Sequence, residues 1–108
     1  MLLLTTLGRR SGRARSVPLF YVREGNALVV CNVRPSGERP NPWPMNVRAH
    51  PRVEIRAAGV IEHRVARAAT GEEVARVWPK LVAIWPAYDE FFARSGERSI
   101  FMLEPETG

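Results

Sequence analysis

The sequence is poor in the side chains that build metal centres and disulfides. Cys31 is the only cysteine among the 108 residues, which excludes an intramolecular disulfide and a cysteine-based metal centre. His50 and His63 are the only histidines, and their separation in the chain does not match metal-ligand spacing. Lysine is nearly absent too, because Lys80 is the only lysine among 16 basic residues. The sequence therefore predicts no metal site.

Long apolar segments are missing as well. The opening MLLLTT is shorter than the apolar region of a signal peptide, which needs roughly 7–15 residues. No run approaches the roughly 20 residues of a membrane-spanning helix. We therefore expect a cytoplasmic chain without an integral membrane segment, and peripheral contact with a membrane stays open.

What the sequence does contain fits one small globular domain over residues 1–108. Hydrophobic residues make up 45% and charged residues 25%, a balance typical of folded proteins. The net charge of +5 favours anionic partners. A GC-rich genome, which favours arginine codons, would explain the overall charge equally well.

Turn residues separate six short apolar segments that predict strands. These lie at residues 2–6, 15–23, 27–32, 52–57, 60–69 and 98–104. Pro18 lacks an N–H, so it predicts a sheet edge or a bulge in the second segment. Residues 33–42 (VRPSGERPNP) are predicted to form a long loop, a feature that is often functional in a compact domain.

Short helices are expected between these strands. Pro44 suits the first turn of a helix over residues 43–50, and Thr70 with Glu73 matches a capping box at a second helix start. Pro79 and Pro86 are expected to break this second region into short pieces, the last over residues 87–94. The fold class is thus mainly β with short helices (α+β). About six antiparallel strands without a βαβ unit favour a barrel whose closure removes the edges.

Four arginines are concentrated between residues 9 and 15, together with Ser11 and Gly12. A glycine-bearing turn exposes backbone N–H groups, and arginine forks bind phosphate or carboxylate through paired hydrogen bonds. This arginine turn (residues 8–15) is therefore a candidate anion site. A solvated basic hairpin tip is the plainer alternative.

Four stretches, in the same order, match the patterns of one known protein family. The pattern TT-x-G-(R/A)-K-(S/T)-G-x-x-R-x-x-P-L is matched by residues 5–12, Arg15 and Pro18-Leu19. The pattern W-x-x-N-L-x-A-N-P is matched at Trp43, Asn46, Ala49 and Pro51, with Val47 in place of Leu and His50 in place of Asn. VWPKLVAIWPAYDEF (77–91) and ERSIFMLEP (97–105) are similar to two later stretches of the family. The sequence thus resembles the deazaflavin-dependent nitroreductase and F-420H2-dependent quinone reductase family.

The resemblance implies a split β-barrel related to the flavin-binding barrels, with coenzyme F-420 as cofactor. This 8-hydroxy-5-deazaflavin carries a phosphodiester and a poly-glutamate tail, which the arginine turn would bind, while residues 17–19 would run beside the ring. The implied activity is hydride transfer from the reduced coenzyme to a quinone or another activated acceptor, with nitroaromatics as an option. The cofactor-binding residues are expected to be Arg9, Arg10, Ser11, Gly12, Arg15, Val17, Pro18, Leu19, Asn32, Trp43 and Asn46.

The sequence departs from the family patterns at several positions, and two of these departures bear on the acceptor. Arg10 replaces a usual lysine, and Pro44 replaces a frequent aromatic residue. Trp85 and Phe91 stand at positions that are often tyrosine, which leaves Tyr88 as the only phenol there. We therefore assign Tyr88 the catalytic role of donating a hydrogen bond to the acceptor oxygen. Trp85, Tyr88 and Phe91 are expected to line the acceptor site.

The resemblance also sets an expectation about the beginning of the chain. Family members usually carry a helical segment ahead of the first strand. Such a segment is expected to be absent or removed here.

Several single residues have two interpretations. Trp78 is expected in the core rather than at the acceptor, whereas Trp85 fits either place. Cys31 is expected to be a small buried residue. Asn46 suits either a cofactor contact or a local hydrogen bond, and Gly37 serves a loop turn or offers its N–H to the cofactor.

Other functions compete with this interpretation. A relative of the same barrel could be non-catalytic or lipid-binding, and an FMN-dependent barrel oxidoreductase is a further, less expected option. A nucleic-acid-binding module is disfavoured, because aromatic and basic residues do not alternate on a strand. A monomer and a homodimer are both compatible with the sequence.

Overall fold

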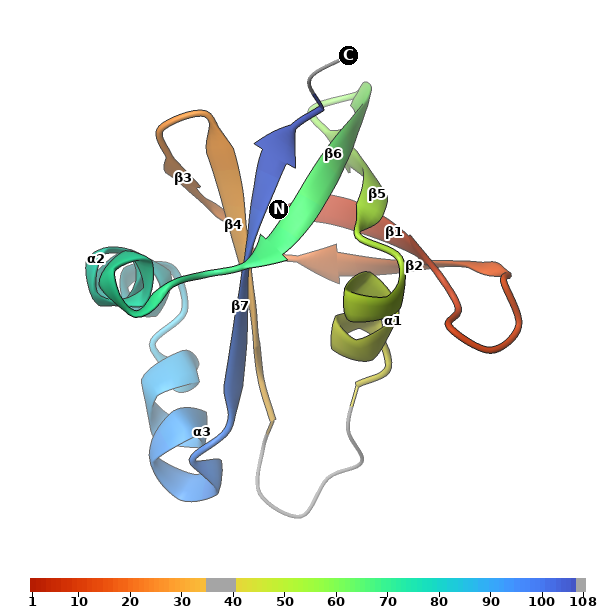
Figure 1. Cartoon of the computed structure of the whole chain (residues 1–108). Coiled ribbons are helices and arrows are strands. Elements are labelled where there is room, and N and C mark those ends of the chain that lie inside the picture. Colours follow the sequence, from red (N-terminus) through yellow and green to blue (C-terminus); the bar gives the residue numbers. More distant parts are fainter. Residues whose placement is uncertain (35–40, 107–108) are drawn as a thin grey trace.

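The computed structural model describes residues 1–34 and 41–106, which form a curled antiparallel sheet flanked by helices (Figure 1). The strands are β1 (Leu2–Leu7), β2 (Ala14–Leu19), β3 (Val22–Glu24), β4 (Ala27–Val33), β5 (Arg52–Ala57), β6 (Val60–Ala68) and β7 (Arg98–Pro105). The helices are α1 (Trp43–Ala49), α2 (Gly71–Ile84) and α3 (Ala87–Ser95). The expectation of a mainly β fold with short helices is confirmed.

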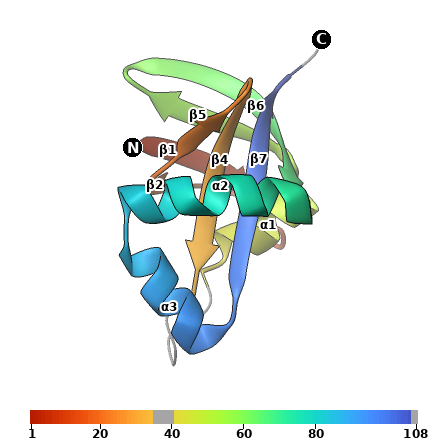
Figure 2. The same ribbon diagram turned by 90° about the vertical axis from the view of Figure 1, so that its left-hand side faces the viewer.

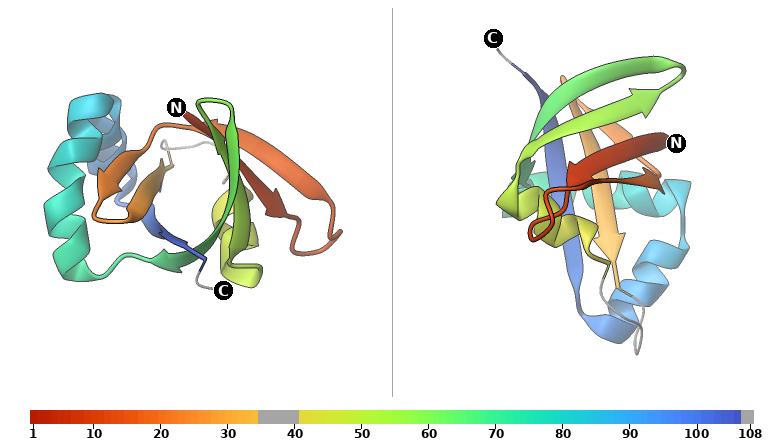
Figure 3. Two further views of the ribbon diagram at one scale, coloured as in Figure 1. Left: turned by 90° about the horizontal axis from the view of Figure 1, so that it is seen from above. Right: turned by 90° about the vertical axis from the view of Figure 1, so that its right-hand side faces the viewer.

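The seven strands form one sheet in the order β2-β1-β5-β6-β7-β4-β3. The sheet curls into a half-barrel, as the view from above shows (Figure 3). The expectation of about six antiparallel strands in a split barrel is confirmed, with seven strands observed. The sheet is not closed by strand pairing, because β2 and β3 remain as two edges. The expected strand over 15–23 is interrupted between Leu19 and Val22. Three residue steps span at most about 11 Å, so the curl must bring the two edges close enough for this short crossing.

Pro18 lies on the edge strand β2, as predicted from its missing N–H. On its inner side, β2 pairs with β1 over six residues, from Leu2↔Leu19 to Leu7↔Ala14. The next pairing is much shorter, because β1 meets β5 only from Leu3↔Arg56 to Thr5↔Glu54. The β1–β2 hairpin is thus joined to the rest of the sheet by three residue pairs.

Two apolar clusters lie on the two faces of the central strands. Inside the curl, Leu4, Val30 and Phe101 belong to one cluster, which α1 completes with Trp43. The second cluster lies where α2 and α3 cover β3, β4 and β7 (Figure 2), and it contains Val77 among its members. Strand β4 is therefore buried on both faces, which explains its almost uninterrupted apolar sequence.

The helix starts follow the sequence, but one break does not. The Thr70 side chain accepts from the Glu73 N–H at 3.3 Å and the Glu73 carboxylate accepts from the Thr70 N–H at 2.9 Å, so the predicted capping box is present. The predicted break at Pro79 is wrong, because α2 continues through it. Ala75 is exposed, so water can bond the carbonyl that Pro79 leaves without a donor. The burial of Val77 and Leu81 holds the helix on both sides of it.

The break at Pro86 and the helix over 43–50 are observed. Pro86 precedes α3, and Pro44 lies in the first turn of α1. The predicted loop over 33–42 falls mostly outside the described residues, which resume at Asn41; Val33 itself belongs to β4.

Candidate functional site

The arginine turn joins β1 to β2 and is held closed by its own backbone. The Gly8 N–H donates to the Arg13 carbonyl, and the Gly12 N–H donates to the Gly8 carbonyl, both at 2.8 Å. Gly12 has φ +68°, a left-handed conformation that favours glycine. The Ser11 hydroxyl oxygen accepts from the Arg13 N–H at 3.2 Å. Three N–H groups that could have faced an anion are therefore used inside the turn, which leaves the guanidinium groups as the main donors.

Asn46 ties the arginine turn to α1. Its side chain is buried, and its Oδ1 atom accepts from the Arg9 backbone N–H at 3.1 Å and from Arg9 Nη1 at 3.3 Å. These bonds fix Arg9 beside the helix. Asn46 is thus a local hydrogen-bonding residue, which was one of its two interpretations, and its contact with a cofactor stays a prediction.

A cleft of about 460 Å³ opens between the arginine turn, β2 and the start of α1, and we name it the arginine cleft. The side chains of Arg10 and Arg15, which border it, make no hydrogen bond or ion pair within the described part of the chain. Their donors are therefore available to a ligand. The cleft is lined by Thr6, Gly8, Arg9, Arg10, Ser11, Arg15, Ser16, Val17, Asn41, Pro42, Trp43 and Asn46.

Thr6 lines this cleft, but its hydroxyl group is buried. The residue is 2% exposed, and its Oγ1 atom is buried without a hydrogen-bond partner. Leaving a buried hydroxyl unpaired costs about 1–3 kcal/mol. The family pattern contains this threonine, but nothing in the sequence indicated that its hydroxyl would be buried and unpaired.

A second cleft, of about 320 Å³, adjoins the first, and we name it the aromatic cleft. It shares Val17, Asn41 and Trp43 with the arginine cleft. The clefts thus form a depression that is basic at one end and apolar at the other. The aromatic cleft is lined by Met1, Val17, Pro18, Leu19, Phe20, Cys31, Asn32, Val33, Asn41, Trp43, Trp85, Tyr88 and Phe91.

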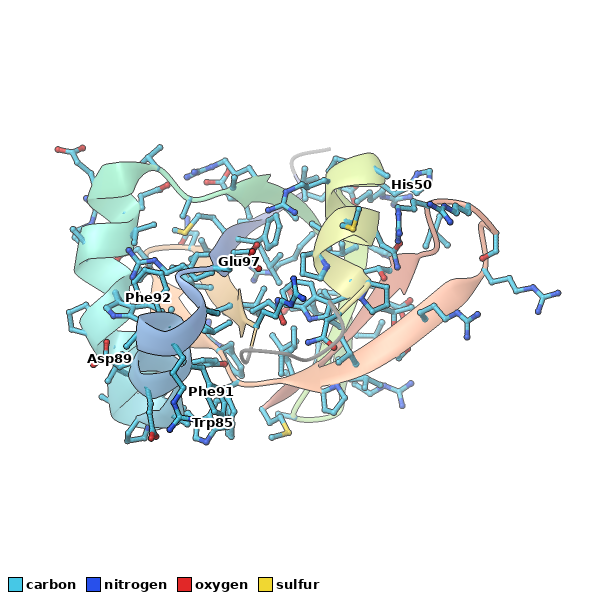
Figure 4. All side chains as sticks on the ribbon, turned by 90° about the horizontal axis from the view of Figure 1, so that it is seen from below. His50, Trp85, Asp89, Phe91, Phe92 and Glu97 are labelled. Atoms are coloured by element: carbon cyan, nitrogen blue, oxygen red, sulfur yellow. The ribbon has the colours of Figure 1, made fainter. Side chains whose placement is uncertain are left out.

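Aromatic rings packed edge to face form one wall of the aromatic cleft. The Trp85 ring centre lies 4.9 Å from that of Tyr88 and 5.6 Å from that of Phe91, with interplanar angles of 79° and 77°. Phe20 approaches Trp85 from the opposite strand edge at 5.8 Å. Trp85 and Phe91 lie close together at the α3 end of the molecule (Figure 4). Trp85 is 38% exposed, so it borders the cleft instead of filling the core.

Tyr88 is the one phenol in this wall. Its side chain is 4% exposed, and its hydroxyl makes no hydrogen bond with any other described residue. Burial, with a smaller contribution from the neighbouring Cys31 thiol, raises the pKa of Tyr88 to about 12. The hydroxyl therefore keeps its proton at neutral pH and can donate one hydrogen bond.

Asn41 stands where the two clefts meet, a position that the sequence did not single out. Its Nδ2 atom donates to the Asn32 Oδ1 atom at 2.8 Å. Asn32, predicted to meet the polar edge of the ring, is therefore held by a neighbouring amide. The signal that could have found Asn41 is its place near the end of the predicted loop over 33–42, just before the Pro42-Trp43 helix start.

Gly12 and Trp78 lie away from both clefts, whereas Cys31 lines the aromatic cleft. Gly12 occupies the exposed tip of the turn and borders neither cleft. Trp78 packs against the second core cluster, as expected. Cys31 is 2% exposed, and burial raises the pKa of its thiol to about 12, so the prediction of a buried residue is confirmed. Gly37 lies outside the described residues.

Among residues 1–34 and 41–106, no group of three or more histidine, cysteine, aspartate or glutamate side chains could hold a metal ion. Within the same residues, no helix has the length and apolar character needed to cross a membrane.

Comparison with known proteins agrees with this geometry. The family model described as F-420H(2)-dependent quinone reductase matches residues 1–105. The chain belongs to this family. With it come the use of coenzyme F-420 and hydride transfer from the reduced coenzyme to quinone-type acceptors.

Individual relatives extend the comparison. A Mycobacterium tuberculosis protein described as an F-420H(2)-dependent quinone reductase is 32% identical over 91 residues, which cover 82% of this chain and 74% of the relative. The solved F-420-H2 dependent reductase FDR-A superposes with a TM-score of 0.84 at 30% identity, covering 95% of this chain and 92% of FDR-A.

Two more solved structures bear on assembly and fold. One described as a domain-swapped dimer gives a TM-score of 0.83 at 30% identity, covering 95% of this chain and 78% of the relative. A Listeria innocua structure described as a pyridoxamine 5'-phosphate oxidase gives 0.68 at 16% identity, covering 98% of this chain and 83% of that one. The latter likeness concerns the fold alone, and the predicted split β-barrel is confirmed.

Proposed function

We propose that residues 1–108 act as a single domain that binds coenzyme F-420 along the two adjoining clefts. The ring lies in the aromatic cleft beside Val17, Pro18 and Leu19, and the phosphate with the nearest tail carboxylates lies in the arginine cleft. The observation that carries this proposal is the continuity of the clefts through Val17, Asn41 and Trp43. The coenzyme has a flat ring at one end and anionic groups at the other, which matches a depression that is apolar at one end and basic at the other.

The donors present in the arginine cleft fit such an anion. Arg10 and Arg15 are without protein acceptors among the described residues, and guanidinium groups form strong, paired hydrogen bonds with phosphate.

The protein's part in the reaction is positioning and polarisation. The coenzyme, when bound, supplies the hydride. The apolar wall of the aromatic cleft excludes water, and Trp85 with Phe91 offers ring edges and faces on which a flat acceptor can stack. Tyr88 donates a hydrogen bond to the acceptor oxygen, on which negative charge grows as the hydride arrives. Because its pKa is raised to about 12, Tyr88 polarises the acceptor without giving up its proton.

This wall favours a quinone over a nitroaromatic acceptor. Of the three acceptor-facing aromatic residues, only Tyr88 carries a hydroxyl, and the indole N–H of Trp85 is the other polar group. A quinone needs one donor at the carbonyl oxygen that becomes charged. A nitro group, with two oxygens to polarise, would be reduced more slowly here.

The test compares two arginine variants of the same turn. Arg15→Ala should weaken F-420 binding by about 1.5–3 kcal/mol, the value of a charge-assisted hydrogen bond. Arg13→Ala is the matched control, because Arg13 borders neither cleft. Titration of ring fluorescence measures both affinities, and added salt should weaken binding in the wild type. Equal affinities in the two variants, or tighter binding of FMN than of F-420, would contradict the proposal.

We further propose that the chain forms a homodimer. Support comes from the relative described as a domain-swapped dimer. It also comes from four apolar side chains of β1 and β6, Leu3, Leu7, Ile61 and Val65, which are between 36% and 50% exposed. They lie on either side of a charged row on β5, made of Arg52, Glu54 and Arg56, on the same face of the sheet. Burying these side chains against a second copy of the chain would remove them from water.

A further inference from the structure

The side chains that line the arginine cleft are rich in hydrogen-bond donors and poor in free acceptors. Its three arginines can only donate hydrogen bonds. Ser11, Ser16 and Asn46 already hold hydrogen bonds to neighbouring residues, and the Thr6 hydroxyl group is buried. The Asn41 Oδ1 atom, in contrast, receives no hydrogen bond from any residue that the structure describes. It is therefore the acceptor that remains available to a ligand in this cleft.

Asn41 and Asn32 form a bonded pair of amides where the two clefts meet, and we name them the amide pair. Asn41 Nδ2 donates to Asn32 Oδ1 at 2.8 Å, which joins the end of β4 to the segment just before α1. Asn41 lines both clefts, and Asn32 lines the aromatic cleft. An amide side chain has two N–H donors and an oxygen that accepts two hydrogen bonds. The shared bond therefore restricts both side chains and still leaves the amide pair able to donate and to accept.

The surroundings of the amide pair lack this double capacity. Val17 and Trp43, the other two residues that the clefts share, offer an apolar side chain and an indole N–H that only donates. On one side lie guanidinium groups, which bind anions. On the other side lie aromatic rings, which pack against flat apolar groups. A ligand that reaches from one cleft to the other is thus matched at the amide pair by groups that both donate and accept, and hydroxyl groups do this.

We propose that the amide pair is a polyol subsite, which binds hydroxyl groups of the chain that links a deazaflavin ring to its phosphate. This inference rests on the proposed function, because it places the linking chain between a ring in the aromatic cleft and a phosphate in the arginine cleft. Asn41 Oδ1 accepts from one hydroxyl group, and Asn32 Nδ2 donates to another. Asn41 is then a positioning residue, because its hold on the linking chain sets how the ring lies beside Tyr88.

The experiment compares two small deazaflavins that lack the phosphate and the tail. One carries the polyol chain on the ring nitrogen, and the other carries a methyl group there. The wild-type chain should bind the polyol compound about three- to tenfold more tightly, as expected for a neutral hydrogen bond. Asn41→Leu keeps the size of the side chain but removes its polar atoms, and it should abolish this preference. Quenching of ring fluorescence measures each affinity.

Asn26→Leu is the matched control, because Asn26 is exposed in the β3–β4 turn and borders neither cleft. It should keep the wild-type preference for the polyol compound. Asn32→Leu breaks the same amide bond but leaves Asn41 Oδ1 in place, so it should reduce the preference only in part. Asn41→Ala gives the same comparison if Asn41→Leu does not fold.

Two results overturn the polyol subsite. The first is a preference for the polyol compound that survives in both Asn41 variants. The second is an equal loss of affinity for the two compounds in Asn41→Leu and in Asn32→Leu, which would mean that the amide pair only ties β4 to α1.

Arg15→Ala separates a failure of this inference from a failure of the proposed function. If the coenzyme does not lie along the two clefts, Arg15→Ala leaves the affinity for F-420 unchanged. If only the polyol subsite is wrong, Arg15→Ala still weakens F-420 binding, while Asn41→Leu keeps the polyol preference. Either result overturns the polyol subsite, and only the first contradicts the proposed function.

Discussion

Tyr88 is the residue on which the acceptor chemistry depends most directly. Tyr88→Phe should lower the rate of hydride transfer about tenfold to a hundredfold, because one donor to the developing negative charge is lost. F-420 affinity should stay nearly unchanged. Single-turnover oxidation of bound reduced coenzyme by menadione measures the rate.

Tyr21→Phe is the control for this change, because Tyr21 packs against the first core cluster and borders neither cleft. Equal rates in wild type and Tyr88→Phe would mean that Tyr88 only packs the core. The acceptor site would then have to be sought elsewhere along the depression.

Cys31 and Tyr88 together make the fold sensitive to alkali. Burial raises both pKa values to about 12 from ordinary values of 9.0 and 10.0. At a pH between the ordinary and the raised pKa of each group, the unfolded chain has lost a proton that the folded chain still binds. The free energy of unfolding therefore falls as pH rises above 9, by at most about 1.4 kcal/mol per pH unit for each group. Urea unfolding at pH 8 to 11 measures this, and Cys31→Ala should flatten the decline; an unchanged slope in that variant contradicts the explanation.

Family motifs and local chemistry predicted some of the residues at the clefts, but not those that depend on contacts between distant segments. The family patterns placed Arg10, Arg15 and Trp43 at the cofactor, and the structure brings them to one cleft. Gly12 belongs to the same pattern but serves the turn itself, through its positive φ. The unpaired Thr6 hydroxyl and the Asn41–Asn32 bond depend on contacts between distant segments, which no local pattern contains.

At the scale of elements, the capping box of α2 is the clearest stabilising feature. Thr70→Ala should lower the free energy of unfolding by about 1 kcal/mol, whereas Thr70→Ser should keep the cap and most of the stability. Chemical denaturation measures both. Equal losses of stability in Thr70→Ala and Thr70→Ser would contradict the role of the hydroxyl.

The Glu73 carboxylate of the same capping box makes stability depend on pH. The Arg67 hydrogen bond to Glu73 holds the pKa of that carboxylate down, at about 2. The contribution of this carboxylate to the free energy of unfolding is therefore present above pH 4.5 and is lost as pH falls towards 2.

Element boundaries were predictable where a local signal decides them. Pro44, Pro86 and the Thr70–Glu73 pair act within one helical turn, and all three mark helix starts in the structure. Pro79 misled the prediction, because proline normally costs about 3 kcal/mol in a helix interior. Here that cost is offset by the burial of Val77 and Leu81 against the sheet, a tertiary effect that a local rule omits.

At the scale of the whole molecule, the outer face of β1 and β6 predicts association. Ile61→Glu should shift a homodimer towards monomer, because a charge in an apolar interface loses its hydration. Size exclusion with light scattering measures the mass. Ile84→Glu is the control, since Ile84 is similarly exposed but lies on α2. A wild-type chain that is monomeric at high concentration would contradict the dimer.

The path of the chain through the sheet was beyond prediction. Six strand signals were visible, but the division of residues 15–23 into β2 and β3 follows from the curl of the sheet and not from a turn residue. The position of β7 between β6 and β4 was not predictable either. The pairing of β7 with these two strands is set by the burial of both faces of the central strands.

The short pairing between β1 and β5 has a consequence for how the molecule opens. The β1–β2 hairpin carries the arginine turn, yet only three residue pairs connect it to β5. Local unfolding should begin where the fewest contacts must break. Amide hydrogens of β1 and β2 should therefore exchange with deuterium faster than those of β4 and β7, which pair over six residues. A ligand that touches both the hairpin and α1 would slow this exchange, so the protection of the hairpin amides would report how firmly the coenzyme is held.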